Sequence, residues 1–179
     1  MELTAALLDL CKKTSHPIIA IDGPAGAGKT TLAQNIKQAM SPFFSSTVIH
    51  MDDLYHGWYH PFDDHFTDAL TKIIASHQSG EPYRYSKFNW GDNRFGPIEE
   101  FPHKDLLILE GVGSSHKVIR SALTTSIWLT IDPQIGLIRV IERDGAASEG
   151  FMTSWLIEQE KQFIESASEE CADFVLTTG

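Results

Sequence analysis

The stretch GPAGAGKT, residues 23–30, predicts the architecture of the whole chain. It follows the apolar run PIIAID, residues 17–22, and precedes a segment with helical periodicity. The pattern G-x-x-x-x-G-K-[ST] is typical of a phosphate-binding loop, whose glycines let consecutive N–H groups turn toward phosphate oxygens. The alternative is a glycine-rich turn that holds a lysine by chance. The strand before the stretch and the helix after it favour a nucleotide site.

The loop supplies the expected contacts to ATP and Mg²⁺. A lysine at the loop end reaches the β- and γ-phosphates, and the hydroxyl that follows it ligates the metal ion. Lys29 and Thr30 occupy these two positions. The predicted nucleotide-binding residues are Gly23, Pro24, Ala25, Gly26, Ala27, Gly28, Lys29, Thr30 and Thr31.

The composition indicates a single globular domain over residues 1–179. The net charge is −10, and the 14 basic residues are scattered, which argues against a nucleic-acid partner. Cys11 and Cys171 form no CxxC pair, as is typical of a protein from a reducing compartment. The chain shows no signal-peptide pattern and no apolar run near the ~20 residues that span a bilayer. We therefore expect a cytoplasmic protein without a membrane partner.

Apolar runs alternate with helical patterns along the chain. This alternation predicts right-handed crossovers and a parallel sheet with helices on both faces, that is, a three-layer α/β/α P-loop NTPase fold with a five-stranded parallel sheet. The strand-like runs are PIIAID (17–22), TVIHM (47–51), LLILEG (106–111), SIWLTI (126–131) and ADFVLTT (172–178). The helical patterns cover residues 3–10, 29–39, 64–77, 133–143 and 150–167.

Absent motifs narrow the class of nucleotide-binding protein. The guanine-reading N-K-x-D or T-K-x-D tetrapeptide of a GTPase is missing, as is the L-S-G-G-Q-like signature of a transporter ATPase. Ring-forming motor domains are usually longer. A small phosphotransferase remains, and it requires a carboxylate near the acceptor hydroxyl, a metal-organising acid and arginines that meet transition-state charge.

Three stretches meet these requirements. VIHMDDLY places Asp52 at the carboxyl end of a strand, where it can take the hydroxyl proton, and the adjacent Asp53 is its rival. DLLILEGVG places Glu110 at the end of the next strand, as the metal-organising acid. Arg139 and Arg143 are four apart and share a helix face, from which they could meet the migrating charge. The structural alternatives are a helix cap, an ordinary strand-end acid and a solvated helix end.

One segment, at about residues 80–104, breaks the alternation of strands and helices. It mixes aromatic and basic residues without a helical period, and long excursions inside a compact domain are usually functional. Its aromatic rings could stack on a base or a sugar, and Arg94 could fix a hydroxyl group. The alternative is a flap whose rings cover the edge of the sheet. His56, His60 and His65 lie just upstream, but their loose spacing does not indicate zinc.

Taken in order, GPAGAGKT, HMDDLY, the EG after an apolar strand and RVIERDG resemble the uridine kinase and phosphoribulokinase-like branch of P-loop kinases. The resemblance spans residues 18–178. It implies that Asp52 is the catalytic base and that Tyr55 helps to frame the acceptor. It also implies that the 80–104 segment is an acceptor-binding hairpin, with contacts from Tyr83, Tyr85 and Arg94.

The sequence therefore predicts an ATP-dependent kinase that transfers the γ-phosphoryl group to a hydroxyl of a small molecule, with a nucleoside as the first expectation. Two alternatives remain open. One is a kinase for another hydroxyl metabolite, such as a sugar, a sugar acid or a vitamin precursor. The other is a nucleotide-binding regulatory ATPase without an acceptor.

Overall fold

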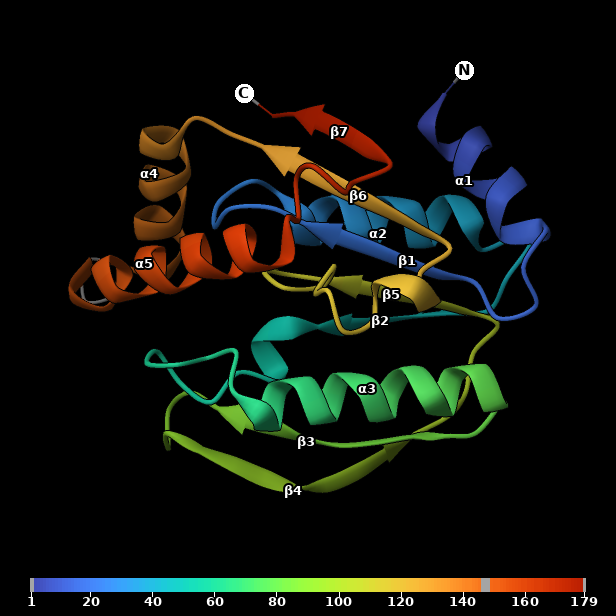
Figure 1. The fold of residues 1–179 in the computed structure, drawn as a ribbon, viewed down its shortest axis with the longest axis horizontal. Coiled ribbons are helices and arrows are strands. Elements are labelled where there is room, and N and C mark those ends of the chain that lie inside the picture. Colours follow the sequence, from blue (N-terminus) through green and yellow to red (C-terminus); the bar gives the residue numbers. More distant parts are fainter. Residues whose placement is uncertain (1, 146–148, 179) are drawn as a thin grey trace.

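A computed structural model describes residues 2–145 and 149–178. It confirms the three-layer α/β/α P-loop fold and the five-stranded parallel sheet (Figure 1). The strand order is β2-β5-β1-β6-β7. The strands are β1 (Ile18–Asp22), β2 (Ser46–His50), β5 (Leu106–Glu110), β6 (Thr125–Thr130) and β7 (Phe174–Thr177).

An apolar core lies on each face of the sheet. β1 and β5 are buried at every position, which is why they read as continuous apolar runs in the sequence. Their side chains alternate between the faces: Ile18 packs into one core, whereas Ile19 and Ile21 pack into the other. The parallel register pairs Ile19 with Ile108 of β5 on one side and with Thr125 of β6 on the other.

Helices cover both faces of the sheet (Figure 1). α1 and α2 pack over one face, and α3 and α5 supply residues to the core on the other. A short 3₁₀ turn, η1 (Met51–Asp53), follows β2 directly, and a second one, η2 (Arg120–Ala122), precedes β6. The α-helices are α1 (Leu3–Lys12), α2 (Lys29–Met40), α3 (Asp64–Ser79), α4 (Pro133–Asp144) and α5 (Glu149–Ser166).

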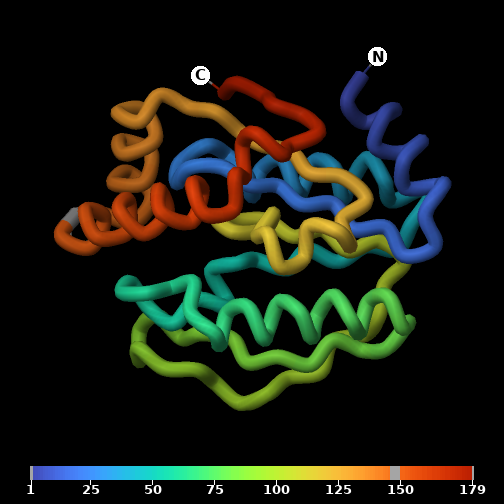
Figure 2. The backbone as a smooth tube through the Cα atoms, viewed as in Figure 1, coloured from blue at the N-terminus to red at the C-terminus, as the bar shows by residue number. Residues whose placement is uncertain are grey.

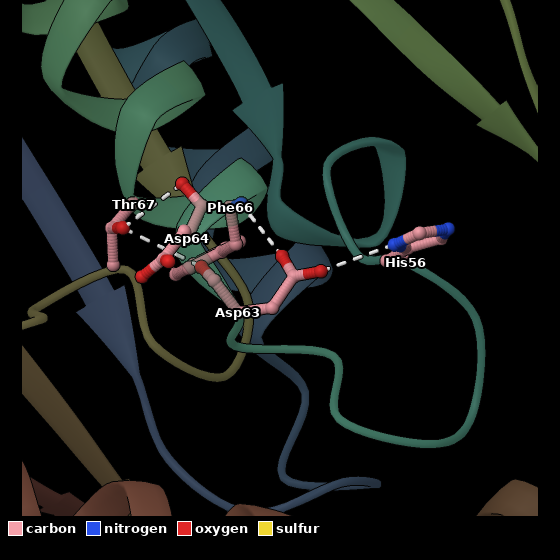
Figure 3. A network of polar contacts seen from close by, with 5 residues as sticks. All are labelled: His56, Asp63, Asp64, Phe66 and Thr67. Carbon is pink, nitrogen blue, oxygen red and sulfur yellow. Dashed lines mark hydrogen bonds and ion pairs between the residues drawn. The ribbon is translucent and has the colours of Figure 1, made fainter.

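Side-chain caps define where α3 begins. The Asp63 carboxylate accepts a hydrogen bond from the Phe66 amide at 3.1 Å, and its second oxygen lies 3.0 Å from His56 Nδ1 (Figure 3). The Thr67 hydroxyl donates to the Asp64 carbonyl at 3.1 Å in the same turn. Because His56 lies on the loop that follows η1, these contacts fasten that loop to the start of the helix.

The segment without helical period folds as an antiparallel hairpin of β3 (Tyr83–Asn89) and β4 (Arg94–Phe101). The hairpin forms a separate two-stranded sheet and packs beside α3, at the bottom of the view in Figure 1. Its turn, the loop after η1 and the start of α5 lie on one side of the molecule (Figure 2). The carboxyl ends of the parallel strands point to the same side.

A buried histidine joins the hairpin to the main sheet. His77, in the last turn of α3, is fully buried; its Nδ1 lies 2.8 Å from the Tyr83 hydroxyl and its Nε2 lies 3.1 Å from the Pro17 carbonyl. The rings of His16 and His103 flank it, with centroids 5.8 and 5.2 Å away. Burial lowers the pKa of His77 to about 4. The ring is therefore neutral, with Nε2 donating to Pro17 and Nδ1 accepting from Tyr83.

This arrangement predicts a loss of stability in acid. The pKa of His77 rises from about 4 in the folded chain to 6.5 in the unfolded chain, so stability is fully present above pH 6.5 and is lost as the pH falls toward 4. At about 1.4 kcal/mol per pKa unit, the full loss is about 3 kcal/mol. Urea unfolding of wild type and His77→Gln, at neutral pH and in mild acid, measures it. Glutamine keeps one donor and one acceptor without titrating, so equal pH dependence of both proteins would contradict the assignment.

Candidate functional site

The phosphate loop runs from the end of β1 to the start of α2, as predicted. Gly23 and Gly26 adopt positive φ angles of 137° and 80°. A Cβ on Gly26 would lie 2.3 Å from the carbonyl oxygen of Gly136 in α4, and a Cβ on Gly23 would lie 2.4 Å from that of Leu129 in β6. The loop therefore needs glycine at both positions, because of its torsions and because other backbone segments approach it closely.

The Asp22 carboxylate holds the start of the phosphate loop in place through hydrogen bonds. Its side chain is buried, and its two carboxylate oxygens accept four hydrogen bonds. The donors are the amides of Gly23 at 2.8 Å and Gly113 at 3.1 Å, together with the amide and the hydroxyl of Ser115 at 3.1 and 2.6 Å. Sequence reasoning missed this residue. Its signal was a charged residue that ends a fully apolar strand immediately before the first loop glycine.

Lys29 lies inside the loop. Its Nζ donates to the carbonyls of Gly23 and Pro24, each at 2.7 Å. Burial lowers the pKa of Lys29, whereas the carboxylates of Asp22, Asp52 and Glu110 oppose that shift. The ammonium group is thus held at the centre of the loop, where consecutive backbone N–H groups and a single cation can meet phosphate oxygens.

Thr30 and Glu110 come together, as predicted for a magnesium site. The Thr30 hydroxyl donates to Glu110 Oε1 at 3.0 Å, and the same oxygen pairs with His50 Nδ1. The hydrogen bond to Glu110 is the main cause that raises the pKa of His50. A hydroxyl and a carboxylate are hard oxygen donors of the kind that Mg²⁺ prefers, and few protein ligands suffice when phosphates and water complete the octahedron. Over the described ranges, no cluster of three or more His, Cys, Asp or Glu side chains could hold a metal alone.

The two neighbouring aspartates of η1 have different surroundings. Asp53 Oδ2 lies 2.9 Å from Lys87 Nζ of β3, so this carboxylate is engaged with the hairpin. Asp52 instead opens into a cavity of about 790 Å³ that also contains the phosphate loop. Asp52 is exposed to solvent on the side of this cavity, while the protein atoms around it partly desolvate the carboxylate; this desolvation, together with the Glu110 charge, raises its pKa. The geometry favours Asp52 over Asp53 as the residue that faces a ligand.

Both predicted arginines line the same cavity from α4. Arg139 Nη1 lies 3.5 Å from the carbonyl oxygen of Gly26. Arg143 makes two hydrogen bonds to the Asp144 carboxylate, at 2.7 and 2.8 Å. The structure thus brings most of the predicted site residues to one cavity. Those that line it are Ala25, Gly26, Gly28, Lys29, Thr30, Thr31, Asp52, Tyr55, Glu110, Arg139 and Arg143.

Three predicted acceptor contacts do not reach the cavity. Tyr83 is fully buried against His77, and Tyr85 stacks on Phe101 at a centroid distance of 4.8 Å. Arg94 lies on the exposed strand β4, 3.6 Å from Asp92. The prediction for these residues is corrected for a physical reason: strand alternation turns both tyrosines into the core, and β4 is the outer strand of the hairpin.

Other aromatic side chains form one wall of the cavity, and among them Trp90 is one of the rings of the 80–104 segment for which the sequence suggested stacking. Trp90, in the hairpin turn, donates its Nε1–H to the Asp52 carbonyl at 3.1 Å. Trp58 comes from the loop after η1, and Phe151 and Trp155 come from α5. We call these residues, together with Tyr55, the aromatic wall: Tyr55, Trp58, Trp90, Phe151 and Trp155.

Comparison with known proteins supports the fold. The structure superposes on a possible uridine kinase from Bacillus stearothermophilus with a TM-score of 0.66 and 19% identity, covering 98% of this chain and 100% of the other. A provisionally described fructose transport system kinase from Silicibacter sp. TM1040 gives a TM-score of 0.64 and 16% identity, covering 98% of each chain. An uncharacterised protein from Eubacterium ventriosum gives 0.54 and 12%, over 91% of this chain and 88% of that one.

No protein-family model matches the sequence, and no curated protein matches it. The fold and the loop define a three-layer α/β/α P-loop fold, which the chain shares with the solved structures named above. Among the described residues, no helix is both long and apolar enough to cross a membrane.

The position of Lys29 predicts that it is required for ATP binding. Charge-assisted hydrogen bonds contribute about 1.5–3 kcal/mol, so Lys29→Ala should weaken ATP affinity by about 10- to 100-fold in isothermal titration calorimetry. Lys37→Ala, which changes a lysine in the last turn of the same helix, is the matched control and should bind as wild type does. Unchanged ATP affinity of Lys29→Ala would refute the loop assignment.

Proposed function

We propose that this protein is an ATP-dependent kinase that transfers the γ-phosphoryl group to a hydroxyl of a small molecule. The observation that carries the proposal is that one cavity contains the phosphate loop, a free carboxylate and two arginines. The carboxylate, Asp52, comes from η1, and Arg139 and Arg143 come from α4. An apolar wall beside this carboxylate offers an acceptor molecule a surface to bind, which a protein that only binds or hydrolyses a nucleotide does not need.

Each group has a distinct role in the proposed reaction. The loop amides and Lys29 would hold the ATP phosphates, and Thr30 and Glu110 would hold the metal ion. Bound Mg²⁺ would offset negative charge on the β- and γ-phosphate oxygens. His50 orients the Glu110 carboxylate through the contact to Nδ1. This network fixes the donor end of the site before the acceptor enters.

Asp52 acts at the acceptor end. It takes the proton of the acceptor hydroxyl as that oxygen forms its bond to the γ-phosphorus, and the bond from this phosphorus to the bridging oxygen of ADP breaks. Arg139 and Arg143 stabilise the charge that moves with the phosphoryl group. Because partial desolvation and Glu110 raise the pKa of Asp52, its carboxylate is a stronger proton acceptor than a fully solvated aspartate.

The first acceptor to consider is a nucleoside, in keeping with the sequence resemblance, and other hydroxyl metabolites come next. ADP release in a coupled assay, with and without nucleosides, sugars and cofactor precursors, tests the proposal. A kinase releases ADP faster when its acceptor is present. An ATPase rate that no added metabolite changes would instead support the regulatory alternative.

The two aspartates allow a matched test of the base. Asp52→Asn keeps the size and hydrogen bonding of the side chain but cannot take a proton, so turnover should fall by about 10²- to 10⁴-fold with ATP affinity nearly unchanged. Asp53→Asn removes only an ion pair with Lys87 and should cost much less. Steady-state kinetics of both variants decides the matter, and a larger loss in Asp53→Asn would show that the base is assigned to the wrong neighbour.

A further inference from the structure

The aromatic wall lies directly beside the proposed base. The Trp90 N–H donates to the backbone carbonyl of Asp52, so the wall adjoins the residue that we propose as the base. Trp58 is its central ring, 4.8 Å from Trp90 and 5.4 Å from Phe151, which it stacks against at 14°. Trp155 stands perpendicular to Trp58 at 6.1 Å. Ring contacts thus connect three segments that are distant in sequence.

Two rings of the wall remain exposed within a concave site. Trp90 is 37% exposed and Phe151 is 42% exposed. Burial of a large aromatic ring gives a large favourable free energy, so these two rings could still gain from a bound ligand. Exposed apolar area that lines a cavity is typical of a ligand site. The cavity therefore contains unused ring surface within reach of Asp52.

Two of the polar groups in the wall already have protein partners. The Tyr55 hydroxyl donates to the Val112 carbonyl at 2.7 Å, and the Trp90 N–H donates to Asp52. Among the carboxylates that line the cavity, Asp144 is paired with Arg143, and Glu110 is hydrogen-bonded to Thr30 at the phosphate end. Asp52 is the third carboxylate, and it is the one that we assign to the acceptor hydroxyl.

The geometry points to an acceptor whose hydroxyl is attached one or two bonds from a planar heteroaromatic ring, such as a hydroxymethyl-substituted pyridine, pyrimidine or thiazole. This inference rests on the proposed function and names the substrate class of the same site. The ring lies on Trp58, Trp90 and Phe151, while the hydroxyl meets Asp52. Phosphoryl transfer then yields the phosphate monoester of that alcohol and ADP, with the proton on Asp52.

A ribose or an open-chain polyol fits this surface less well. Either would place several hydroxyls against ring faces, and a buried hydroxyl without a partner costs about 1–3 kcal/mol. A nucleoside would also separate its base from the reacting hydroxyl by the whole sugar. The wall adjoins Asp52, so it favours an acceptor whose ring lies close to its reacting hydroxyl.

Tryptophan fluorescence reports binding independently of turnover. The chain has four tryptophans, and the three in the wall become the only ones in Trp128→Phe, which changes the core residue of β6. We would titrate this variant with a panel of hydroxymethyl pyridines, pyrimidines and thiazoles, and with uridine and ribose. The inference expects saturable quenching by at least one heteroaromatic alcohol, faster ADP release with the same compound, and neither effect from ribose.

A pair of adjacent substitutions locates the binding surface. Stacking on an aromatic side chain contributes about 1–3 kcal/mol, so Trp58→Leu should raise the KM for that alcohol about tenfold or more. Tyr59→Leu removes the neighbouring exposed ring, which does not line the cavity, and should leave the KM unchanged. An equal effect of both substitutions would overturn the assignment of the wall.

The outcomes separate this inference from the function on which it rests. Quenching by a heteroaromatic alcohol without any increase in ADP release would support the binding surface and contradict the kinase. Faster ADP release with uridine or ribose, and with no heteroaromatic alcohol, would support the kinase and overturn the inference. Absence of quenching by the whole heteroaromatic panel would also overturn it.

Discussion

The Asp22 carboxylate is the interaction on which the site depends. It receives hydrogen bonds from the first residue of the phosphate loop and from the loop that follows β5, so it fixes the two segments relative to each other. Glu110 ends β5 immediately before that second loop. Within the loop, the Val112 carbonyl accepts a hydrogen bond from the Tyr55 hydroxyl. One buried carboxylate therefore fixes the relative positions of three parts of the site: the phosphate loop, Glu110 and the aromatic wall. A buried charge is tolerated here because four donors surround it.

The charge distribution explains how an acidic protein can attract a nucleotide. With a net charge of −10, the chain as a whole repels anions. Lys29, Arg139 and Arg143 nevertheless converge on one cavity, and the loop adds backbone N–H groups. Asp52 and Glu110 share the cavity with them, so these three cations and two carboxylates face the same space. The proposed phosphoryl transfer uses both kinds of charge.

The sequence predicted the fold well because its signals are local. Continuous apolar runs identified the parallel strands, and the Gly23–Thr30 pattern located the loop between a strand and a helix. Spacing placed Arg139 and Arg143 on one helix face, and both line the cavity. These features need no knowledge of which elements pack together.

The acceptor end could not be predicted in the same way. The faces of β3 depend on how the hairpin packs beside α3, and this packing turned Tyr83 and Tyr85 into the core. The aromatic wall combines the loop after η1, the hairpin turn and α5, so no local pattern contains it. Asp22 and His50 act through partners about 60 to 90 positions away in the chain, which periodicity does not reveal.

The fate of the γ-phosphoryl group tests the central claim most directly. Phosphorus-31 NMR of a reaction that contains the protein, Mg²⁺, ATP and the acceptor found by ADP release follows that group without a coupling enzyme. The account predicts a phosphate monoester resonance that grows in step with ADP and is absent when the acceptor is left out. Growth of inorganic phosphate alone, in step with ADP and at the same rate with or without the acceptor, would contradict it.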